Sequence, residues 1–263
     1  MQTVWYLVQL FLSLGLGALF AFLAGKQRWH LPTARALDAV LYALLFLMGV
    51  NTAKIPDIKE RIMRMGLDAL LATVLVVIGC IITASLLGLL VRKKVNPSER
   101  VRQRITWERL KTPLLMILIV VAGIVAAITT GLFDWFEGSM ITYILYLLLF
   151  LVGMQMVQHE VDLVPLLKSP MMLLLPISTV LGTYLGALAF PLVSSYTLTE
   201  SLTLVSGFGW YSLSGVLISS LGDPQLGAVS FLSNLFRESF SFLLIPLLAT
   251  VSHASFSSIS IAG

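Results

Sequence analysis

Ser206-Gly-Phe-Gly-Trp-Tyr-Ser-Leu-Ser-Gly215 interrupts a chain that otherwise consists of apolar stretches long enough to cross a membrane. Each of its three glycines lowers helix stability by about 1 kcal/mol relative to alanine. Serine hydroxyls can hydrogen-bond the backbone groups that a break leaves free, whereas lipid offers such groups no partner. The stretch therefore predicts a broken helix inside the protein, whose backbone groups contact a substrate. Close packing of helices through small residues is the alternative interpretation.

The residues of this break that we expect at a binding site combine small, hydroxyl and aromatic side chains. They are Ser206, Gly207, Gly209, Trp210, Tyr211, Ser212 and Ser214. Tryptophan and tyrosine also gather at the two surfaces of a bilayer, so an interfacial position is the alternative for the two aromatic residues.

A polar stripe follows in the next apolar stretch. Its members are spaced so that they share one helical face, and they are Ser230, Asn234, Arg237, Glu238 and Ser241. One ionised side chain at mid-membrane costs roughly 2.5–3.5 kcal/mol, so two adjacent ones indicate a function. We expect Glu238 to bind a cation or carry a proton, and Arg237 to bind a carboxylate or tune Glu238, beside Asn234. Adjacent residues point about 100° apart, so the two can face different partners. Alternatively, they only hold helices together as an ion pair.

The composition indicates an all-α helical bundle in a membrane. Hydrophobic residues make up 58% of the 263 and charged residues 11%, roughly half the charged share of a soluble domain. Mean hydropathy is +0.95. This balance excludes a soluble enzyme. The net charge of +4 comes from segments between apolar stretches, so we expect the lipid bilayer as a partner and no nucleic acid.

Cofactor and metal chemistry leave no signature in the sequence. The single cysteine, Cys80, lies in an apolar stretch, where we expect plain packing. His30, His159 and His253 lie outside the apolar stretches. There is no nucleophile elbow, HExxH or phosphate-binding motif. We therefore expect no cofactor, no metal site and no enzyme activity.

Eight apolar stretches reach the length of about 20 residues that crosses a bilayer. They are Val4–Gly25, Leu37–Ile55, Ala69–Val91, Leu114–Phe133, Ser139–Gln158, Met171–Val193, Leu198–Leu221 and Leu226–Val251. No long linker separates them, so residues 1–263 are expected to form a single transmembrane domain.

Lysines and arginines are distributed unevenly among the segments between these stretches. Three follow the first stretch, eight the third and one the fifth, against four after the second. Cytoplasmic segments carry the excess of basic residues. We therefore expect the amino terminus outside, the basic segment 92–112 inside, and the end of the eighth stretch outside.

An internal repeat links the second and fifth stretches. Leu41-Tyr-Ala-Leu-Leu-Phe-Leu-Met-Gly-Val-Asn51 aligns with Leu145-Tyr-Leu-Leu-Leu-Phe-Leu-Val-Gly-Met-Gln155, with seven of eleven positions identical. The copies lie three stretches apart, and an odd separation inverts the second copy in the membrane. Residues 1–92 and 113–194 are therefore candidate inverted repeats, typical of alternating-access transporters, and residues 195–263 carry the site. Convergence between leucine-rich helices is the alternative.

The segments SGFGWYSLSG (206–215) and NLFRES (234–239) resemble the bacterial lysine exporter family of the LysO type. The repeated LFLMG and LFLVG segments and the basic segment after the third stretch also fit. The resemblance implies export of L-lysine and lysine analogues across the bacterial inner membrane, coupled to inward protons, with Glu238 as the family's membrane-embedded glutamate. It further implies another apolar stretch with a second acidic residue past Gly263, on which transport is expected to depend.

These observations favour an inner-membrane exporter of a basic amino acid, with its amino terminus outside. A membrane channel or a structural subunit, in which Arg237 and Glu238 only join helices, is the alternative from another class. A membrane enzyme is a third possibility that lacks a recognisable nucleophile. Saturable, gradient-coupled flux would distinguish an exporter from a channel.

Overall fold

A computed structural model describes residues 2–24, 30–91, 107–159 and 170–249. These residues form α-helices and one short 3-10 turn and contain no strand, which confirms the predicted all-α fold. The helices are α1 (Gln2–Ala24), α2 (His30–Ala53), α3 (Ile58–Val91), α4 (Trp107–Thr130), α5 (Ser139–Gln158), α7 (Pro170–Ala189), α8 (Leu198–Val205), α9 (Tyr211–Ser220) and α10 (Pro224–Ala249), with the 3-10 turn η2 at Phe190–Leu192.

Five stretches of the described chain are long and apolar enough to cross a membrane. They are Trp5–Ala24, Thr33–Ala53, Ile58–Gly88, Ser139–Gln158 and Leu173–Leu192, and a shorter apolar helix covers Leu114–Thr130. Many large apolar side chains of these helices are exposed, among them Phe11, Phe22 and Leu118. So much exposed apolar surface is typical of a protein that lies in lipid. The chain is a polytopic helical membrane protein.

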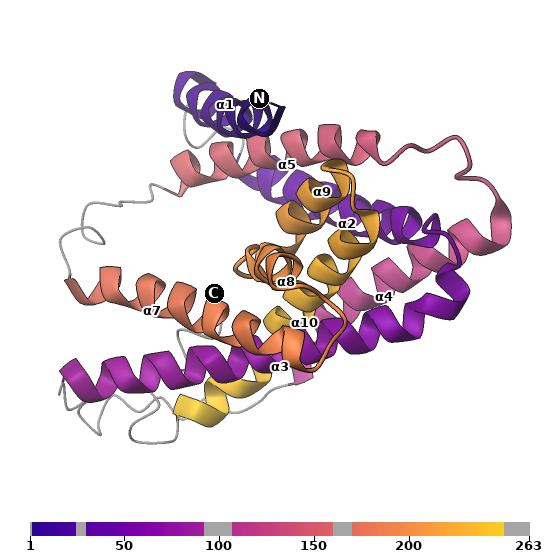
Figure 1. Cartoon of the computed structure of the whole chain (residues 1–263). Coiled ribbons are helices and arrows are strands. Elements are labelled where there is room, and N and C mark those ends of the chain that lie inside the picture. The colour runs from indigo at the N-terminus through magenta and orange to yellow at the C-terminus, as the bar shows by residue number, and fades with distance from the viewer. Residues whose placement is uncertain (1, 25–29, 92–106, 160–169, 250–263) are drawn as a thin grey trace.

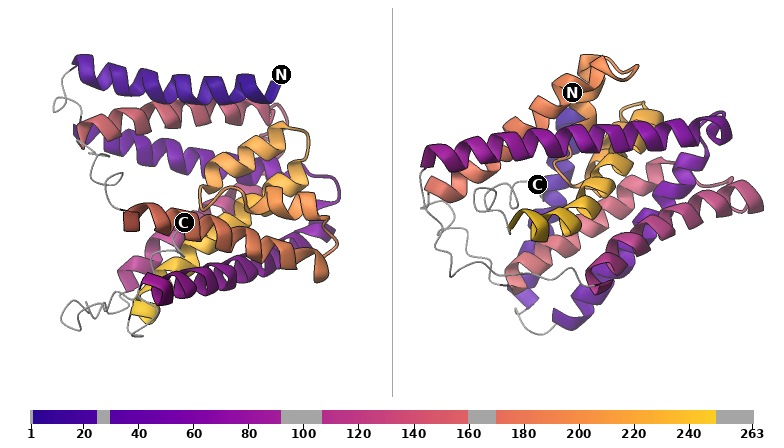
Figure 2. Two further views of the ribbon diagram at one scale, coloured as in Figure 1. Left: turned by 60° about the vertical axis from the view of Figure 1, so that its left-hand side comes forward. Right: turned by 90° about the horizontal axis from the view of Figure 1, so that it is seen from below.

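The long helices pack in three pairs. Helix α1 lies along α5, α2 along α4, and α3 along α7. Figures 1 and 2 show α1 and α5 at one side of the molecule, α3 and α7 at the other, and α8, α9 and α10 between them. The central position of α10 brings it into contact with α2, α3, α4, α8 and α9. The polar stripe of α10 is therefore enclosed by protein on several sides.

Glycines bring the paired helices into backbone contact. A Cβ on Gly17 of α1 would overlap the carbonyl of Phe150 in α5, and a Cβ on Gly153 would overlap that of Leu14. The same arrangement joins α2 and α4, where Gly49 lies against the carbonyl of Val120. Close approach through small residues gives helices in a membrane their van der Waals contact.

The expected seventh crossing, Leu198–Leu221, is wrong as a single crossing. The segment forms two short helices, α8 and α9, and it begins and ends at the same end of the bundle. Before α8, Ser195 accepts a hydrogen bond from Arg64 (2.7 Å). After α9, Gln225 accepts one from Arg61 (3.1 Å). Because both arginines lie in the first two turns of α3, the α8–α9 pair is a re-entrant hairpin that turns back inside the protein.

The course of α10 follows from this hairpin. Gln225 lies beside Arg61, Ser233 beside Thr73, and further along Arg237 beside Cys80. Helix α10 therefore runs in the same direction as α3. The expectation that the end of this stretch lies on the side of the amino terminus is wrong, because α8 and α9 together do not cross the bundle.

Helix α3 also begins earlier than expected, at Ile58 instead of Ala69. Arg61, Arg64 and Asp68, which precede the expected start of this stretch, are on this helix. The helix continues beyond the apolar stretch because the ends of long helices can extend out of the hydrocarbon layer into water, which hydrates their polar side chains. Most of the basic segment, residues 92–106, lies outside the described residues.

Candidate functional site

The broken helix is present where the sequence predicts it. Helix α8 ends at Val205, α9 begins at Tyr211, and four of the five residues between them, 206–209, form turns. Phe208 has φ +48° and Gly209 has φ +91°, a left-handed conformation that glycine adopts at little cost. The Trp210 N–H donates to the Gly207 carbonyl at 2.8 Å. The glycine at 209 thus permits the reversal between the two helices.

Asn234 of α10 holds this break together. Its Oδ1 accepts a hydrogen bond from the Gly209 N–H at 2.9 Å. Its Nδ2 donates to the Ser214 hydroxyl at 3.2 Å and to the Ser230 carbonyl at 2.9 Å. The side chain is only 3% exposed. One buried amide therefore joins the turn, α9 and α10, and it satisfies a backbone donor that the break leaves free.

Gly207 lies at the closest point of this arrangement. A Cβ there would come within 2.6 Å of the Ser214 Cβ and 2.8 Å of the Asn234 Nδ2. Separations below 3.0 Å are too short for real Cβ atoms, so only glycine allows the turn to approach α9 and α10 in this way.

The remaining predicted residues of the break lie around this centre. Ser206 is exposed, donates to the Leu202 carbonyl and lies 3.3 Å from the Tyr184 hydroxyl of α7. Trp210 is 42% exposed at the start of α9. Tyr211 and Ser212 form the first turn of α9, and their side chains lie outside the described part.

Arg237 is buried, and it faces α3. Its guanidinium donates to the Cys80 sulfur at 3.7 Å, and the residue is 2% exposed. Buried charges in proteins are paired or held by hydrogen bonds. The expectation that Cys80 only packs is therefore incomplete, because its sulfur contacts the buried cation.

Glu238 is half-buried, and one of its carboxylate oxygens has no hydrogen-bond partner in the described structure. That oxygen, Oε2, is buried. A carboxylate normally accepts several hydrogen bonds, and an unsatisfied buried oxygen calls for an explanation. A bound cation would pair with this oxygen, and a proton would remove its charge.

A comparison with known protein families identifies the family of this chain. The model of the family described as lysine exporter LysO matches residues 11–116 and 117–263. These ranges include the hairpin and the polar stripe of α10. The chain belongs to the lysine exporter LysO family.

Two relatives carry the family's name. The lysine exporter LysO of Escherichia coli is 27% identical over 217 residues, which cover 80% of this chain and 70% of that protein. A protein of Haemophilus influenzae, described as a candidate lysine exporter, is 34% identical over 116 residues, or 43% of this chain and 60% of that protein. No solved structure matches the chain.

In this member of the LysO family, a second polar cluster lies between α3, α7 and α10. The Thr73 hydroxyl donates to the Ser233 carbonyl at 2.9 Å, and Cys80 lies 3.6 Å from the Thr183 hydroxyl. Ser178 adds a buried hydroxyl with no described partner. Sequence reasoning missed this cluster because its members are small and lie in apolar stretches. The signal was the seven-residue spacing of Thr73 and Cys80, which puts both on one face of α3.

Proposed function

We propose that this chain exports L-lysine and lysine analogues across the bacterial inner membrane in exchange for protons, with Glu238 as the carboxylate that both cations share. Membership of the lysine exporter family supports the substrate. The observation that carries the mechanism is the buried Glu238 Oε2, which has no hydrogen-bond partner among the described residues. This oxygen lies on the same helix as Asn234, which holds the broken hairpin.

The electrostatic argument concerns the side-chain ammonium of lysine. Moving that extra charge through a low-dielectric interior requires a compensating anion. Ionised Glu238 can pair with the ammonium, and after the substrate leaves it can accept a proton from the outside. Because one carboxylate cannot hold both cations at once, the two fluxes are coupled. In this proposal Arg237, the neighbour of Glu238 on α10, and the backbone groups of the hairpin would receive the carboxylate of the amino acid.

Alternating access would come from inverted repeats, in which α1, α2 and α3 correspond to α4, α5 and α7. The packing of the helices supports this correspondence. If α1 corresponds to α4 and α5 to α2, the pair of α1 and α5 corresponds to the pair of α4 and α2, and both pairs are in contact. The glycine contacts agree residue by residue. Gly153 lies against Leu14, and the equivalent Gly49 lies against Val120. Transporters with such repeats rock one repeat against the other around a site near the midplane.

The alternative, a channel or a structural subunit, uses Arg237 and Glu238 only to join helices. That Glu238 Oε2 has no hydrogen-bond partner in the described part of the chain favours transport over this alternative, because a carboxylate placed for packing alone is normally satisfied by its partners.

The test is lysine efflux from cells that carry Glu238→Gln, at several external pH values. Glutamine keeps the shape but removes both the charge and the titration. We expect at least about a tenfold loss of export, because a lost charge-assisted hydrogen bond of about 1.5–3 kcal/mol is a factor of ten or more. The host should become hypersensitive to a lysine analogue.

The control is Glu60→Gln, which removes an exposed acid in the first turn of α3. It should leave efflux unchanged at an equal amount of protein in the membrane. Wild-type export by Glu238→Gln across the pH range would assign Glu238 to packing and would refute the shared-carboxylate mechanism.

A further inference from the structure

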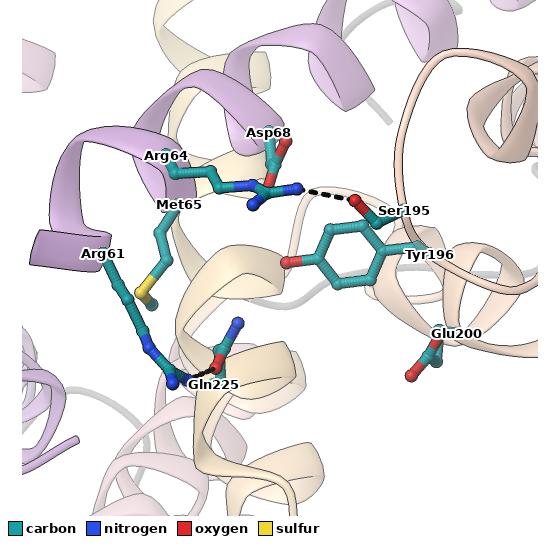
Figure 3. A pocket seen from close by; sticks show the side chains of 8 residues that line it. All are labelled: Arg61, Arg64, Met65, Asp68, Ser195, Tyr196, Glu200 and Gln225. Atoms are coloured by element: carbon teal, nitrogen blue, oxygen red, sulfur yellow. Dashed lines mark hydrogen bonds between the residues drawn. The ribbon is translucent and has the colours of Figure 1, made fainter. Parts of the chain in front are cut away.

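A cavity of about 430 Å³ opens where the hairpin begins, between the first turns of α3, α8 and α10. Charged side chains of both signs line it: Arg61, Arg64 and Asp68 of α3, and Glu200 of α8. Tyr196 and Gln225 complete its polar lining. Figure 3 shows the two arginines on one side of Tyr196 and Glu200 on the other. The cavity is distinct from the polar stripe in the middle of α10.

Among the described residues each of the two arginines donates one hydrogen bond, and Arg61 Nη2 also lies 3.9 Å from the exposed Asp57 carboxylate. A guanidinium has five N–H groups. Arg64 donates from Nη2 to the Ser195 hydroxyl at 2.7 Å, and Arg61 donates from Nη1 to the Gln225 amide oxygen at 3.1 Å. These contacts fix the two side chains at the edge of the cavity. A guanidinium held in this way recognises a carboxylate by two parallel hydrogen bonds.

The carboxylates are placed to receive a cation. Glu200 takes part in the cap of α8, where Oε2 accepts from the Thr197 N–H and hydroxyl, both at 2.7 Å. Its Oε1 has no partner among the described residues. Asp68 follows Arg64 by one turn of α3 and points to the same cavity.

Tyr196 remains a neutral hydrogen-bonding group at this site. Burial raises the pKa of its phenol, and the nearby carboxylate of Asp68 raises that pKa further. The hydroxyl therefore stays protonated at neutral pH, and Figure 3 shows it directed between Arg61 and Gln225.

We propose that this cavity is a second binding site for a free amino acid, in which Arg61 and Arg64 hold the α-carboxylate while Asp68 and Glu200 hold ammonium groups. The inference deepens the proposed function and rests on it for the identity of the ligand. The volume lies within the range of 300–1,000 Å³ that small-molecule sites occupy. Both charges of the zwitterion and the second ammonium of a dibasic amino acid find an opposite charge here.

The place of the cavity gives it a role in the transport cycle. It lies at the end of the bundle where α3 begins, opposite the end of α3 at Val91, and this is the outer end in the expected orientation. Its walls belong to α3, to the start of the hairpin and to α10, and the last two carry the candidate site. Lysine bound there would occupy an exit vestibule, and a high outside concentration would fill the vestibule and slow further export.

The experiment uses protection of a cysteine from a membrane-impermeant maleimide. Ser195→Cys places a thiol at the exposed edge of the cavity, and the wild type serves as the blank because its single cysteine, Cys80, is buried. L-lysine should slow labelling at least severalfold. Cadaverine, which has both ammonium groups of a diamine but no carboxylate, should not protect. Equal protection by both compounds, or none by L-lysine, would overturn the proposal.

Charge variants provide the second measurement. In the Ser195→Cys background, Arg61→Gln with Arg64→Gln should raise the L-lysine concentration needed for protection at least tenfold. Lys59→Gln, an exposed basic residue of the same helix that does not line the cavity, should leave it unchanged. Equal shifts in both variants would show a general charge effect and refute the site.

The two proposals fail separately. Absence of lysine efflux from the wild type would refute the proposed function, while carboxylate-dependent protection would still establish the cavity as an amino-acid site. Normal efflux without protection would refute the cavity alone. The comparison of L-lysine with cadaverine needs only Ser195→Cys, so it remains decisive if the double arginine variant does not fold.

Discussion

Asn234 shows how one buried side chain can set the geometry of a binding site. It accepts from the Gly209 N–H and donates to Ser214 and Ser230, so three segments depend on one amide. Neither an aspartate nor an apolar residue could do both, because only an amide combines an acceptor with two donors at this position. The asparagine therefore stabilises the break whether or not it touches substrate.

Asn234→Ala should lower the stability of the protein and its rate of export together. The substitution removes the acceptor of the Gly209 N–H and the amide bonds to Ser214 and Ser230, and an unsatisfied buried backbone donor costs about 1–3 kcal/mol. Thermal unfolding in detergent measures the first effect, and lysine efflux the second. The matched control is Ser239→Ala on the same helix, since that hydroxyl only donates to the Leu235 carbonyl of its own helix. Equal melting temperatures for the two variants would contradict the role of Asn234.

At the scale of single residues, the sequence was a good guide to burial and a poor one to partners. The spacing of Ser230, Asn234 and Arg237 predicts one face, and all three are buried. Adjacent residues point in different directions around a helix, so Arg237 can contact Cys80 while Glu238 Oε2 has no hydrogen-bond partner in the ranges that the structure describes. The partner itself could not be predicted, because Cys80 meets Arg237 only through the packing of α3 on α10.

The helices are joined by glycines at corresponding points of the two candidate repeats. Gly17 and Gly123 each lie against a carbonyl of the aligned segments, at Phe150 and Phe46. These contacts exclude any side chain. These matching contacts of the partner helices α1 and α4 support the proposed inverted repeat, which the sequence alignment indicates only for α2 and α5.

Gly17→Val should prevent α1 from packing on α5, whereas Gly15→Val should be tolerated. A Cβ on Gly17 overlaps the Phe150 backbone, while one on Gly15 meets nothing within 4 Å. Overpacking of this kind typically costs about 1–3 kcal/mol or more. The amount of monodisperse protein after extraction, and its melting temperature, give the measurement. The inverted repeat adds a further expectation: Gly123→Val should be as damaging as Gly17→Val, and a harmless Gly123→Val would contradict the equivalence.

At the scale of elements, the error in the sequence-based interpretation has a physical origin. The mean hydropathy of a segment depends on its composition and does not reveal the direction in which the backbone runs. A hairpin of two short apolar helices therefore has the same mean hydropathy as one helix that crosses the membrane. The sequence did contain signals for helix starts on both sides of this segment. Thr197 and Glu200 form a capping box at the start of α8, and Asp223 caps the Leu226 N–H at 2.8 Å just before Pro224 begins α10. The N-terminal caps of α8 and α10 bound the segment, and the glycine break between them indicates that it contains two helices.

The whole molecule combines a membrane scaffold of paired helices with a central insert of α8, α9 and α10 (Figure 1). The hairpin changes the topology, because a re-entrant element adds no crossing. Helix α10 then ends on the same side as α3. In the expected orientation that side is the cytoplasm, where the basic segment 92–112 lies. The uneven distribution of basic residues is compatible with this change, since the segments around the hairpin carry no lysine or arginine.

Single cysteines can test this topology in intact cells. Ser195→Cys and Ser220→Cys lie before α8 and at the end of α9, and Glu137→Cys lies between α4 and α5; all three side chains are exposed. We expect an impermeant maleimide added outside to label all three, because the hairpin returns to the side from which it enters. Gln103→Cys in the basic segment should be labelled only after the membrane is opened. If α8 and α9 formed one crossing, positions 195 and 220 would label from opposite sides. Such a result would overturn the re-entrant hairpin, and outside labelling at position 103 would reverse the orientation of the whole bundle.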